Sequence, residues 1–355
     1  MIRARRGAVC GRITLERPTK INALTPEMIA GIGAALTEWE TDPAVRFVVL
    51  DGEGPRGFCA GGDVVFVYES MRADIGAAVP GGAALRFWAD EYRLDARIAS
   101  YRKPIVALMR GIVMGGGVGR AGHASLRIVT DSTRLAMPEV GIGLIPDVGG
   151  TWLLSRPPGE TGTYLALTGR SVGAADALML GLADVYVPEA QLPALTEELT
   201  ASSDGAATIV GRFAATPASA PLLAERATID AVFGLDDVEE IVDALLAEGY
   251  GFASDTASAM LAKSPTSLKL TLRALREARE LTHLEDALAL EYRIMSRLAG
   301  GHDFFAGIRA TVIDKDRLPN WSPATLAAVA DADLDRYFTP LGADELSFVT
   351  EETVL

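Results

Sequence analysis

Three glycine-rich clusters constrain this chain more than any other feature, because each must form tight turns close to an apolar segment. They span residues 58–63, 114–123 and 137–150. The first follows the apolar segment 45–50, and the second follows the apolar segment 104–109. Glycine lets a ligand approach the backbone closely, since no side chain stands in the way. The first two clusters therefore predict turns that aim free N–H groups into a cleft, where a pair of N–H groups can bind an oxyanion.

Apolar segments alternate with helical patterns before residue 200. Residues 26–39 predict a helix, with Pro26 in its first turn and Thr25 as its N-cap. A helix that starts at Gly116 would add its positive end to the second glycine turn. The predicted strands are residues 9–15, 45–50, 104–109, 126–129 and 183–187. Strands separated by helices indicate an α/β chain with buried sheets.

The composition changes near residue 200. Residues 201–221 are rich in Ala, Ser, Thr, Gly and Pro and predict a mobile connection. Beyond it, apolar residues at spacings of three and four form helical stripes, which are typical of core or subunit packing. We therefore expect residues 1–200 to form the core. Residues 201–355 would form a C-terminal helical region of the same domain, used for capping or oligomerisation.

Charge and cysteine content exclude several classes of protein. The chain has 33 Lys and Arg against 47 Asp and Glu, a net charge of −14, and no long basic run, so we expect no nucleic-acid partner. No apolar run approaches the ~20 residues of a membrane helix, and no signal peptide is evident, so we expect no membrane partner. The two cysteines, Cys10 and Cys59, form no CxxC, and the three histidines are scattered. These features argue against a disulfide framework or a metal site and favour a reducing cytoplasm.

The second glycine cluster also contains a GxGxxG pattern, formed by Gly117, Gly119 and Gly122. By itself this pattern is a weak indication of dinucleotide binding. It lies more than 100 residues into the chain, and no acidic residue is clearly placed at the end of a second strand. We therefore expect no NAD or FAD.

The third cluster carries two carboxylates, Glu139 and Asp147, with two glycines and a proline between them. A continuous helix is not expected there, and a folded loop could bring both carboxylates into one cleft. The alternative is a solvated Glu139 and an Asp147 that caps a helix through residues 152–154. Asp63 has the same alternative, as the cap of the helix that follows the first cluster. The spacing alone favours these alternatives and does not decide whether both carboxylates share a cleft.

At these clusters the chain resembles the enoyl-CoA hydratase/isomerase (crotonase) superfamily, and within it the 3-hydroxyisobutyryl-CoA hydrolase branch. The matching stretches include ERPTKINAL (16–24), GFCAGGDV (57–64), KPIVALMRGIVMGGGVG (103–119), AMPEVGIGLIPDVGG (136–150), LALTGR (165–170), SPTSLKLTLR (264–273) and LEYRIMSRLAGGHDFFAGIRATVIDKD (290–316). The resemblance extends over residues 9–348. It implies a crotonase-like ββα spiral core, a C-terminal helical region that caps the site or mediates trimer contacts, and an acyl-CoA thioester substrate.

The resemblance also implies roles for residues of the first two clusters. Gly62 and Gly116 match the two oxyanion-hole residues of the family, and Gly115 and Gly117 lie beside them as substrate-binding residues. The residues that match the region holding the CoA nucleotide are Lys20, Ala23, Ala60, Gly61 and Asp63.

The carboxylates place the chain nearer to the hydrolases than to the hydratases. Hydratases of this family use two glutamates, and the first of these positions is Gly119 here, whereas the second is Glu139. Asp147 stands where hydratases usually have glycine. The hydrolase branch has Gly, Glu and Asp at these three positions, as here, and Glu91 matches a substrate-binding glutamate of that branch. Arg120 and Thr151 depart from the usual residues, an apolar residue and a glycine.

The resemblance therefore implies hydrolysis of a short 3-hydroxyacyl-CoA, as in valine breakdown. The thioester oxygen would lie between the N–H groups of Gly62 and Gly116. Glu139 would activate water or attack the carbonyl carbon itself. Asp147 would orient the β-hydroxyl group and assist proton transfer, and Glu91 would bind near the acyl end.

No cofactor or metal is expected, since coenzyme A is part of the substrate, and a homo-oligomer (trimer or hexamer) is expected. The first alternative is an enoyl-CoA hydratase or isomerase that uses Glu139 alone. The second is a non-catalytic acyl-CoA-binding protein. The two carboxylates argue against mere binding, because desolvating them would cost free energy without a use.

Overall fold

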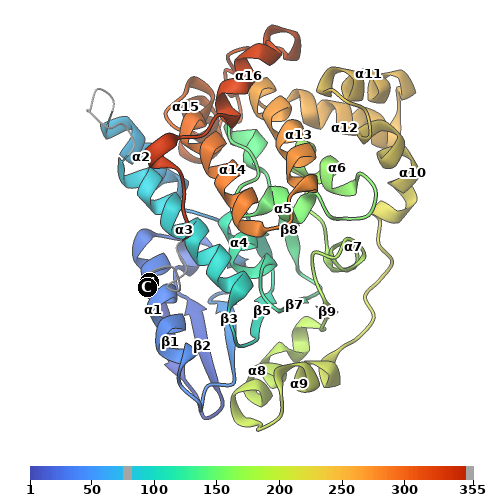
Figure 1. Ribbon diagram of the computed structural model, residues 1–355. Coiled ribbons are helices and arrows are strands. Elements are labelled where there is room, and N and C mark those ends of the chain that lie inside the picture. The colour runs from blue at the N-terminus through green and yellow to red at the C-terminus, as the bar shows by residue number, and fades with distance from the viewer. Residues whose placement is uncertain (75–81, 349–355) are drawn as a thin grey trace.

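The computed structural model describes residues 1–74 and 82–348 and contains a six-stranded main sheet (Figure 1). The strands lie in the order β1-β2-β3-β5-β7-β9, with β1 antiparallel to β2 and the other neighbours parallel. Their bounds are β1 (Ile2–Arg6), β2 (Cys10–Leu15), β3 (Phe47–Gly52), β5 (Ile105–Met109), β7 (Leu126–Val129) and β9 (Val185–Tyr186). This arrangement confirms the predicted α/β class.

A second, three-stranded sheet arises because the chain repeats a ββα unit. Its strands, which pair in parallel in this order, are β4 (Gly57–Cys59), β6 (Ile112–Met114) and β8 (Arg134–Ala136). Strands β3 and β4 lead into α2 (Val64–Ala73) and α3 (Gly82–Ser100), and β5 and β6 lead into α4 (Gly116–Gly122). Each unit adds one strand to each sheet, which confirms the ββα spiral.

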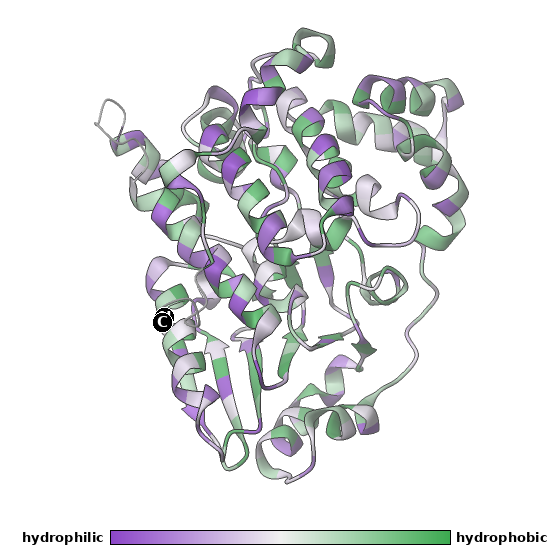
Figure 2. Ribbon diagram, viewed as in Figure 1, coloured by the Kyte–Doolittle hydropathy of each residue, from purple (hydrophilic) through white to green (hydrophobic). Residues whose placement is uncertain are grey.

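The central strands β3 and β5 of the main sheet are buried on both faces, as their apolar sequences require. Side chains alternate along a strand. In β3, Val48 and Leu50 belong to the larger apolar cluster, whereas Phe47 and Val49 belong to a smaller one. Helices α8 (Leu192–Ala201) and α9 (Ala206–Phe213) cover the smaller cluster. Figure 2 shows the apolar, green residues along these central strands and purple residues on outward helix surfaces.

The remaining helices lie mostly beyond one end of the main sheet, where the C-terminal third of the chain gathers (Figure 1). They are α1 (Pro26–Glu40), α5 (Gly150–Leu154), α6 (Thr161–Thr168), α7 (Ala174–Met179), α10 (Leu222–Phe233), α11 (Val238–Glu248), α12 (Gly251–Leu261), α13 (Pro265–Glu280), α14 (Leu284–Leu298), α15 (His302–Ile308) and α16 (Asp331–Phe338). Helix α1 begins as predicted, because the Thr25 side chain accepts a hydrogen bond from the N–H of Met28. The division of the chain at residue 200 stays a prediction, and residues 349–355 lie outside the described part.

Three local predictions were wrong. The strand predicted at residues 183–187 is limited to β9, because the N–H of Ala183 donates to the carbonyl oxygen of Ala177 in α7. The segment 201–221 contains helix α9, because Ile209 and Val210 are apolar residues that pack in the smaller cluster and outweigh the polar composition around them. The strand predicted from residue 45 begins at Phe47, since a turn closes on the N–H of Val45 and Asp42 caps that turn. Within residues 1–74 and 82–348, no helix combines the length and apolar character needed to cross a membrane.

Candidate active site

Two backbone turns face each other, one after β4 and one after β6. Gly61 has a φ of +108° and Gly115 has a φ of +49°, conformations that residues with side chains rarely adopt. Helix α4 begins at Gly116, as predicted, and a Cβ atom on Gly116 would lie only 3.1 Å from the N atom of Gly62. Within the described residues, neither of these two N–H groups donates a hydrogen bond to the protein. The predicted pair of oxyanion donors is therefore brought together.

Asn22 holds the first of these turns in place, although the sequence alone did not single it out. It is fully buried, and its φ is +56°. Its amide nitrogen donates to the carbonyl oxygens of Glu53, Gly57 and Phe58 at 3.0–3.1 Å. These bonds tie the entry to the turn to a segment more than 30 residues away in sequence.

Glu139 and Asp147 enter one cavity, as the cleft hypothesis predicted. Glu139 begins the 3-10 turn η2 (Glu139–Ile142) and is 6% exposed, so the alternative of a solvated carboxylate is wrong. Asp147 does not cap a helix, because the N-cap of α5 is Gly149. Its Oδ2 atom instead accepts a hydrogen bond from the Tyr92 hydroxyl at 2.7 Å.

The two carboxyls of this loop hold their protons more strongly than free side chains do. Burial, and then the charge of Asp147, raise the pKa of Glu139 well above its ordinary value. Burial raises the pKa of Asp147 to about 6, although the hydrogen bond from Tyr92 opposes this rise. Neighbouring carboxyls titrate as a pair, so the first proton leaves much more easily than the second. The pair therefore holds one proton more tightly than two separate carboxyls would.

Helix α3 adds a third buried carboxyl beside the turn that carries Gly116. Glu91 is 2% exposed, and a Cβ atom on Gly116 would collide with its Oε1 atom. Burial raises the pKa of Glu91 to about 7, and the charge of Arg120 opposes this rise. Arg120 is fully buried on α4, where it donates to the carbonyl oxygen of Glu91 at 3.1 Å and forms an ion pair with Asp95. The unusual arginine therefore ties α4 to α3 behind the site.

These groups surround a cavity of about 580 Å³. The predicted site residues that line it are Ala60, Gly61, Gly62, Glu91, Gly115, Gly116, Glu139 and Asp147. The opposite wall comes from the C-terminal helical region and includes Ala262, Lys263, Met295, Phe304, Ile308, Thr311, Arg317 and Pro319. The sequence alone did not single out its two cations, Lys263 and Arg317. Burial lowers the pKa of the Lys263 ammonium.

The other predicted site residues, Lys20, Ala23, Asp63 and Gly117, do not line this cavity. Lys20 is exposed at the end of the 3-10 turn η1 (Pro18–Lys20). Asp63 caps α2, as its structural alternative predicted, and pairs with Arg17 at 2.9 Å. Gly117 packs against Cys59, where a Cβ atom would strike the backbone. Their roles toward CoA or the substrate stay predictions.

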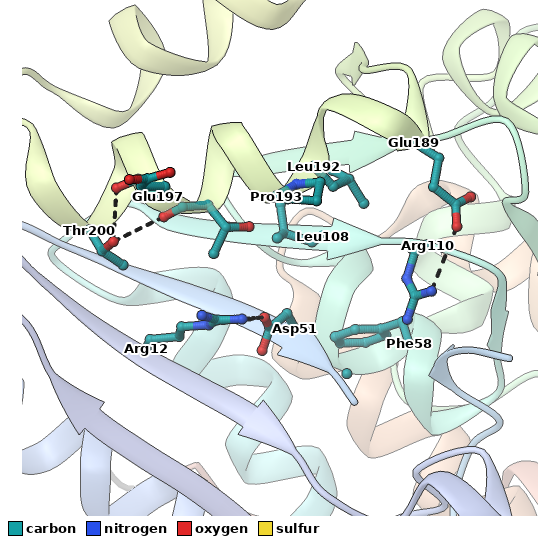
Figure 3. Close-up of a pocket in the computed structure, with 12 residues that line it drawn as sticks. Arg12, Asp51, Phe58, Leu108, Arg110, Glu189, Leu192, Pro193, Glu197 and Thr200 are labelled. Carbon is teal, nitrogen blue, oxygen red and sulfur yellow. Dashed lines mark hydrogen bonds and ion pairs between the residues drawn. The ribbon is translucent and has the colours of Figure 1, made fainter. Parts of the chain in front are cut away.

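A second cavity, of about 630 Å³, lies between α8 and the main sheet (Figure 3). Arg12 points toward Asp51, to which it donates at 3.0 Å, and Arg110 lies 3.6 Å from Glu189. It contains none of the predicted site residues.

Comparison with known proteins identifies the family. Residues 10–338 match the enoyl-CoA hydratase/isomerase family. The chain belongs to this family. The mitochondrial 3-hydroxyisobutyryl-CoA hydrolase of Gallus gallus is 41% identical over 346 residues, which cover 95% of this chain and 88% of the relative. The corresponding Homo sapiens hydrolase is 39% identical over 347 residues, with the same coverage of each chain.

Two solved structures are similar over almost the whole chain. A carnitinyl-CoA dehydratase from Mycobacterium thermoresistibile has a TM-score of 0.92 and 45% identity, with 98% of each chain covered. An enoyl-CoA hydratase from Rhodobacter sphaeroides has a TM-score of 0.87 and 42% identity, with 98% of this chain and 99% of the other covered. These neighbours confirm the crotonase-like fold.

In this member of the enoyl-CoA hydratase/isomerase family, Gly119 has no room for a side chain. A Cβ atom there would lie 2.7 Å from Cβ of Val148 and 2.9 Å from Oδ1 of Asp95. Real Cβ atoms essentially never approach heavy atoms this closely. The position at which the resemblance places a hydratase glutamate is therefore filled by neighbouring groups.

Tyr92 and Asp95, which lie on α3 with Glu91, were not predicted as site residues from the sequence. The signal that was available is positional, since Asp95 and Glu91 lie at helical spacing from the buried Phe87 and Ile98. A carboxylate on an otherwise apolar stripe must be buried, and buried carboxylates are paired or functional.

Proposed function

We propose that this enzyme hydrolyses the thioester bond of a short 3-hydroxyacyl-CoA such as 3-hydroxyisobutyryl-CoA. The observation that carries the proposal is the pairing of a filled position 119 with a cavity that holds both Glu139 and Asp147. The names of the curated relatives, which are 3-hydroxyisobutyryl-CoA hydrolases, agree with it.

The reaction follows from the positions of these groups. The thioester oxygen accepts hydrogen bonds from the N–H groups of Gly62 and Gly116, which stabilise the negative charge that develops on it. In one route, Glu139 removes a proton from water as the water oxygen bonds to the carbonyl carbon. The C–S bond then breaks, the thiolate takes up a proton, and a carboxylic acid and free CoA are released. In the other route, the carboxylate of Glu139 attacks the carbonyl carbon, the C–S bond breaks, and the thiolate leaves and takes up a proton. Water then hydrolyses the resulting anhydride, which releases the carboxylic acid and regenerates Glu139.

Asp147 and Glu91 recognise the acyl group in this proposal. Asp147 accepts a hydrogen bond from the β-hydroxyl group, while Tyr92 keeps its other oxygen oriented. Glu91, with an Oε1 atom that has no partner among the described residues, faces the oxyanion turn from α3. A hydroxylated acyl chain would satisfy carboxylates that an unsubstituted one would leave unpaired, which favours the hydroxylated substrate.

The CoA portion of the bound substrate would extend from the cavity along the wall formed by the C-terminal helical region. Lys263 and Arg317 place positive charge there, which suits a phosphate-bearing ligand despite the net negative charge of the chain. Lys20, Ala23, Ala60, Gly61 and Asp63 remain the proposed contacts of the nucleotide. A homo-oligomer, a cytoplasmic location and the absence of a cofactor or metal also remain predictions.

A hydratase or dehydratase is the second candidate, and the names of the two solved neighbours favour it. Addition of water across C2 and C3 needs groups that serve both the water and C2. Because position 119 is closed to a side chain, Glu139 would have to do this with Asp147 as its only helper on the loop. The geometry therefore favours hydrolysis over hydration.

A single pair of assays separates the candidates. Thiol release from 3-hydroxyisobutyryl-CoA and 3-hydroxypropionyl-CoA is measured alongside the loss of enoyl absorbance with crotonyl-CoA. We expect rapid thiol release and little hydration. Rapid hydration with no thiol release from any 3-hydroxyacyl-CoA would overturn the proposal, and tight CoA binding with neither activity would indicate a non-catalytic binding protein.

A further inference from the structure

A carboxylate from the C-terminal helical region holds the loop that carries Asp147. Glu291 lies on α14 and is fully buried. Its Oε2 atom accepts from the N–H of Gly149 at 2.7 Å, and its Oε1 atom accepts from the N–H of Thr151 at 2.8 Å. The hydroxyl of Thr151 also donates to Oε1, at 2.5 Å. One side chain thus binds three donors within three consecutive residues of the loop.

The loop needs this support because its backbone is strained between Asp147 and α5. Val148 has a φ of +53°, and a β-branched residue in this region is a genuine outlier. Such conformations persist only where the surrounding structure holds them. His123 provides a further restraint, since its Nε2 atom lies 2.9 Å from the carbonyl oxygen of Val148. Burial lowers the pKa of His123 to about 4, so the ring stays neutral and acts as a hydrogen-bond donor to this acceptor.

The strained turn at Val148 and the Asp147 side chain move together, because the two residues are adjacent in the chain. Asp147 directly precedes Val148, whose side chain fills the space beside Gly119. A rotation of the turn would therefore move the Asp147 carboxylate away from the Tyr92 hydroxyl and change its distance from the substrate. The hydrogen bonds of Glu291 act on the residues directly after the strained one, where they oppose this rotation.

We propose that Glu291 and Thr151 are positioning residues, which hold the turn at residues 148–149 and so orient Asp147 toward the acyl group of the substrate. The proposal rests on the proposed function for its kinetic test but not for its structural test. It assigns the C-terminal helix α14 a direct part in the geometry of the site, beyond covering it.

Glu291→Gln is the most informative variant. An amide has one accepting oxygen, so either the N–H of Gly149 or the two donors of Thr151 must face an NH₂ group. We expect kcat for thiol release to fall about 10²-fold, the effect of a misplaced group of this kind. KM should stay within about twofold, because the CoA portion binds elsewhere in the cavity. Asp286→Asn, an exposed neutralisation on the same helix, serves as the matched control.

A matched pair at Thr151 keeps the test decisive if the Glu291 variant folds poorly. Thr151→Val has nearly the same shape but lacks the hydroxyl donor, and we expect it to lower kcat by up to about tenfold, as the loss of one hydrogen bond predicts. Thr151→Ser keeps the donor and should restore most of the turnover. Equal turnover in the Val and Ser variants would contradict the proposal.

Hydrogen–deuterium exchange of the peptide that covers residues 144–154 gives a readout independent of activity. We expect faster exchange in Glu291→Gln and Thr151→Val than in the wild type and Asp286→Asn. If the wild type releases no thiol, the proposed function fails, and the exchange data still decide whether Glu291 and Thr151 hold the turn at residues 148–149. Unchanged exchange together with a kcat within twofold of the wild type would overturn the proposal that Glu291 and Thr151 are positioning residues.

Discussion

The active-site cavity and the cavity beneath α8 are similar in volume but differ in how their buried carboxylates are paired. In the cavity beneath α8, Arg12 pairs with Asp51 and Arg110 lies near Glu189. Asp51 has one buried oxygen without a partner, but its other oxygen pairs with Arg12, whereas Glu139 in the active-site cavity pairs with no cation among the described residues. Volume alone does not distinguish a functional cavity. A buried carboxylate without a cationic partner does, because its free-energy cost is retained only where its reactivity is used.

The comparison predicts that the same substitution, Glu to Gln, lowers turnover in the active-site cavity and leaves it unchanged in the cavity beneath α8. Glu139→Gln should lower turnover of the best 3-hydroxyacyl-CoA by roughly 10²–10⁴-fold, the usual range for a positioned acid–base group, while folding and CoA binding are retained. Steady-state thiol release and CoA titration measure these effects. Glu189→Gln, in the other cavity, is the matched control and should leave turnover unchanged. Near-normal turnover of Glu139→Gln would remove Glu139 from the mechanism.

The oxyanion turn offers the second test. A Cβ atom on Gly116 would collide with the Glu91 carboxylate and crowd the N–H of Gly62, so Gly116→Ala should lower kcat by about 10²–10³-fold. A larger residue such as valine should abolish activity. Gly33→Ala is a suitable control, since a Cβ atom there would meet nothing within 4 Å, and it should raise stability slightly. A structure of a substrate complex in which the Gly116 N–H points away from the acyl carbonyl would refute the assignment.

The burial of Glu91 can be tested through the pH dependence of the free energy of unfolding. Its pKa is about 7 in the folded protein, above its ordinary value of 4.5. Between these values the folded state binds more protons than the unfolded state, so the free energy of unfolding falls as the pH rises. This stabilising contribution is present below pH 4.5 and is lost as the pH passes 7.

Glu91→Gln removes that titration, so the variant should lose less stability than the wild type between pH 5 and pH 8. The full difference corresponds to on the order of 3 kcal/mol. Urea unfolding at both pH values measures it, with Asp51→Asn as the control from the other cavity. A wild type and a Glu91→Gln variant with parallel pH profiles would show that Glu91 is not desolvated.

The sequence predicted the catalytic loop better than its supports, for a physical reason. Gly62, Gly116 and Glu139 lie in short glycine-rich turns, where local backbone requirements leave a visible pattern. Glu291 lies on a helix and acts on residues about 140 positions away, so no local pattern records the contact. The only trace is that it falls at helical spacing from Leu288 and Met295, on a stripe that is otherwise apolar.

Other features were not predictable for the same reason. Arg120 stood out as unusual, but its partner Asp95 comes from α3, and only the packing of α3 on α4 brings them together. In segment 201–221, a short apolar pair decided that a helix forms, whereas the surrounding composition suggested a loop. Tertiary contacts, rather than local propensity, settled each of these cases.

The smallest effect is expected in the cavity beneath α8, where it tests whether the two cavities are independent. Phe58 lines this cavity and lies four residues before Gly62, so a disturbance could travel along β4 to the turn that carries Gly62. Arg12 and Asp51 form a partly exposed pair, and such pairs contribute no more than about 1 kcal/mol. We therefore expect Arg12→Gln to lower the free energy of unfolding by at most about 1 kcal/mol and to leave kcat within twofold. A tenfold loss of turnover with little change in stability would show that the strand transmits the disturbance, and the two cavities would then have to be treated as one coupled system.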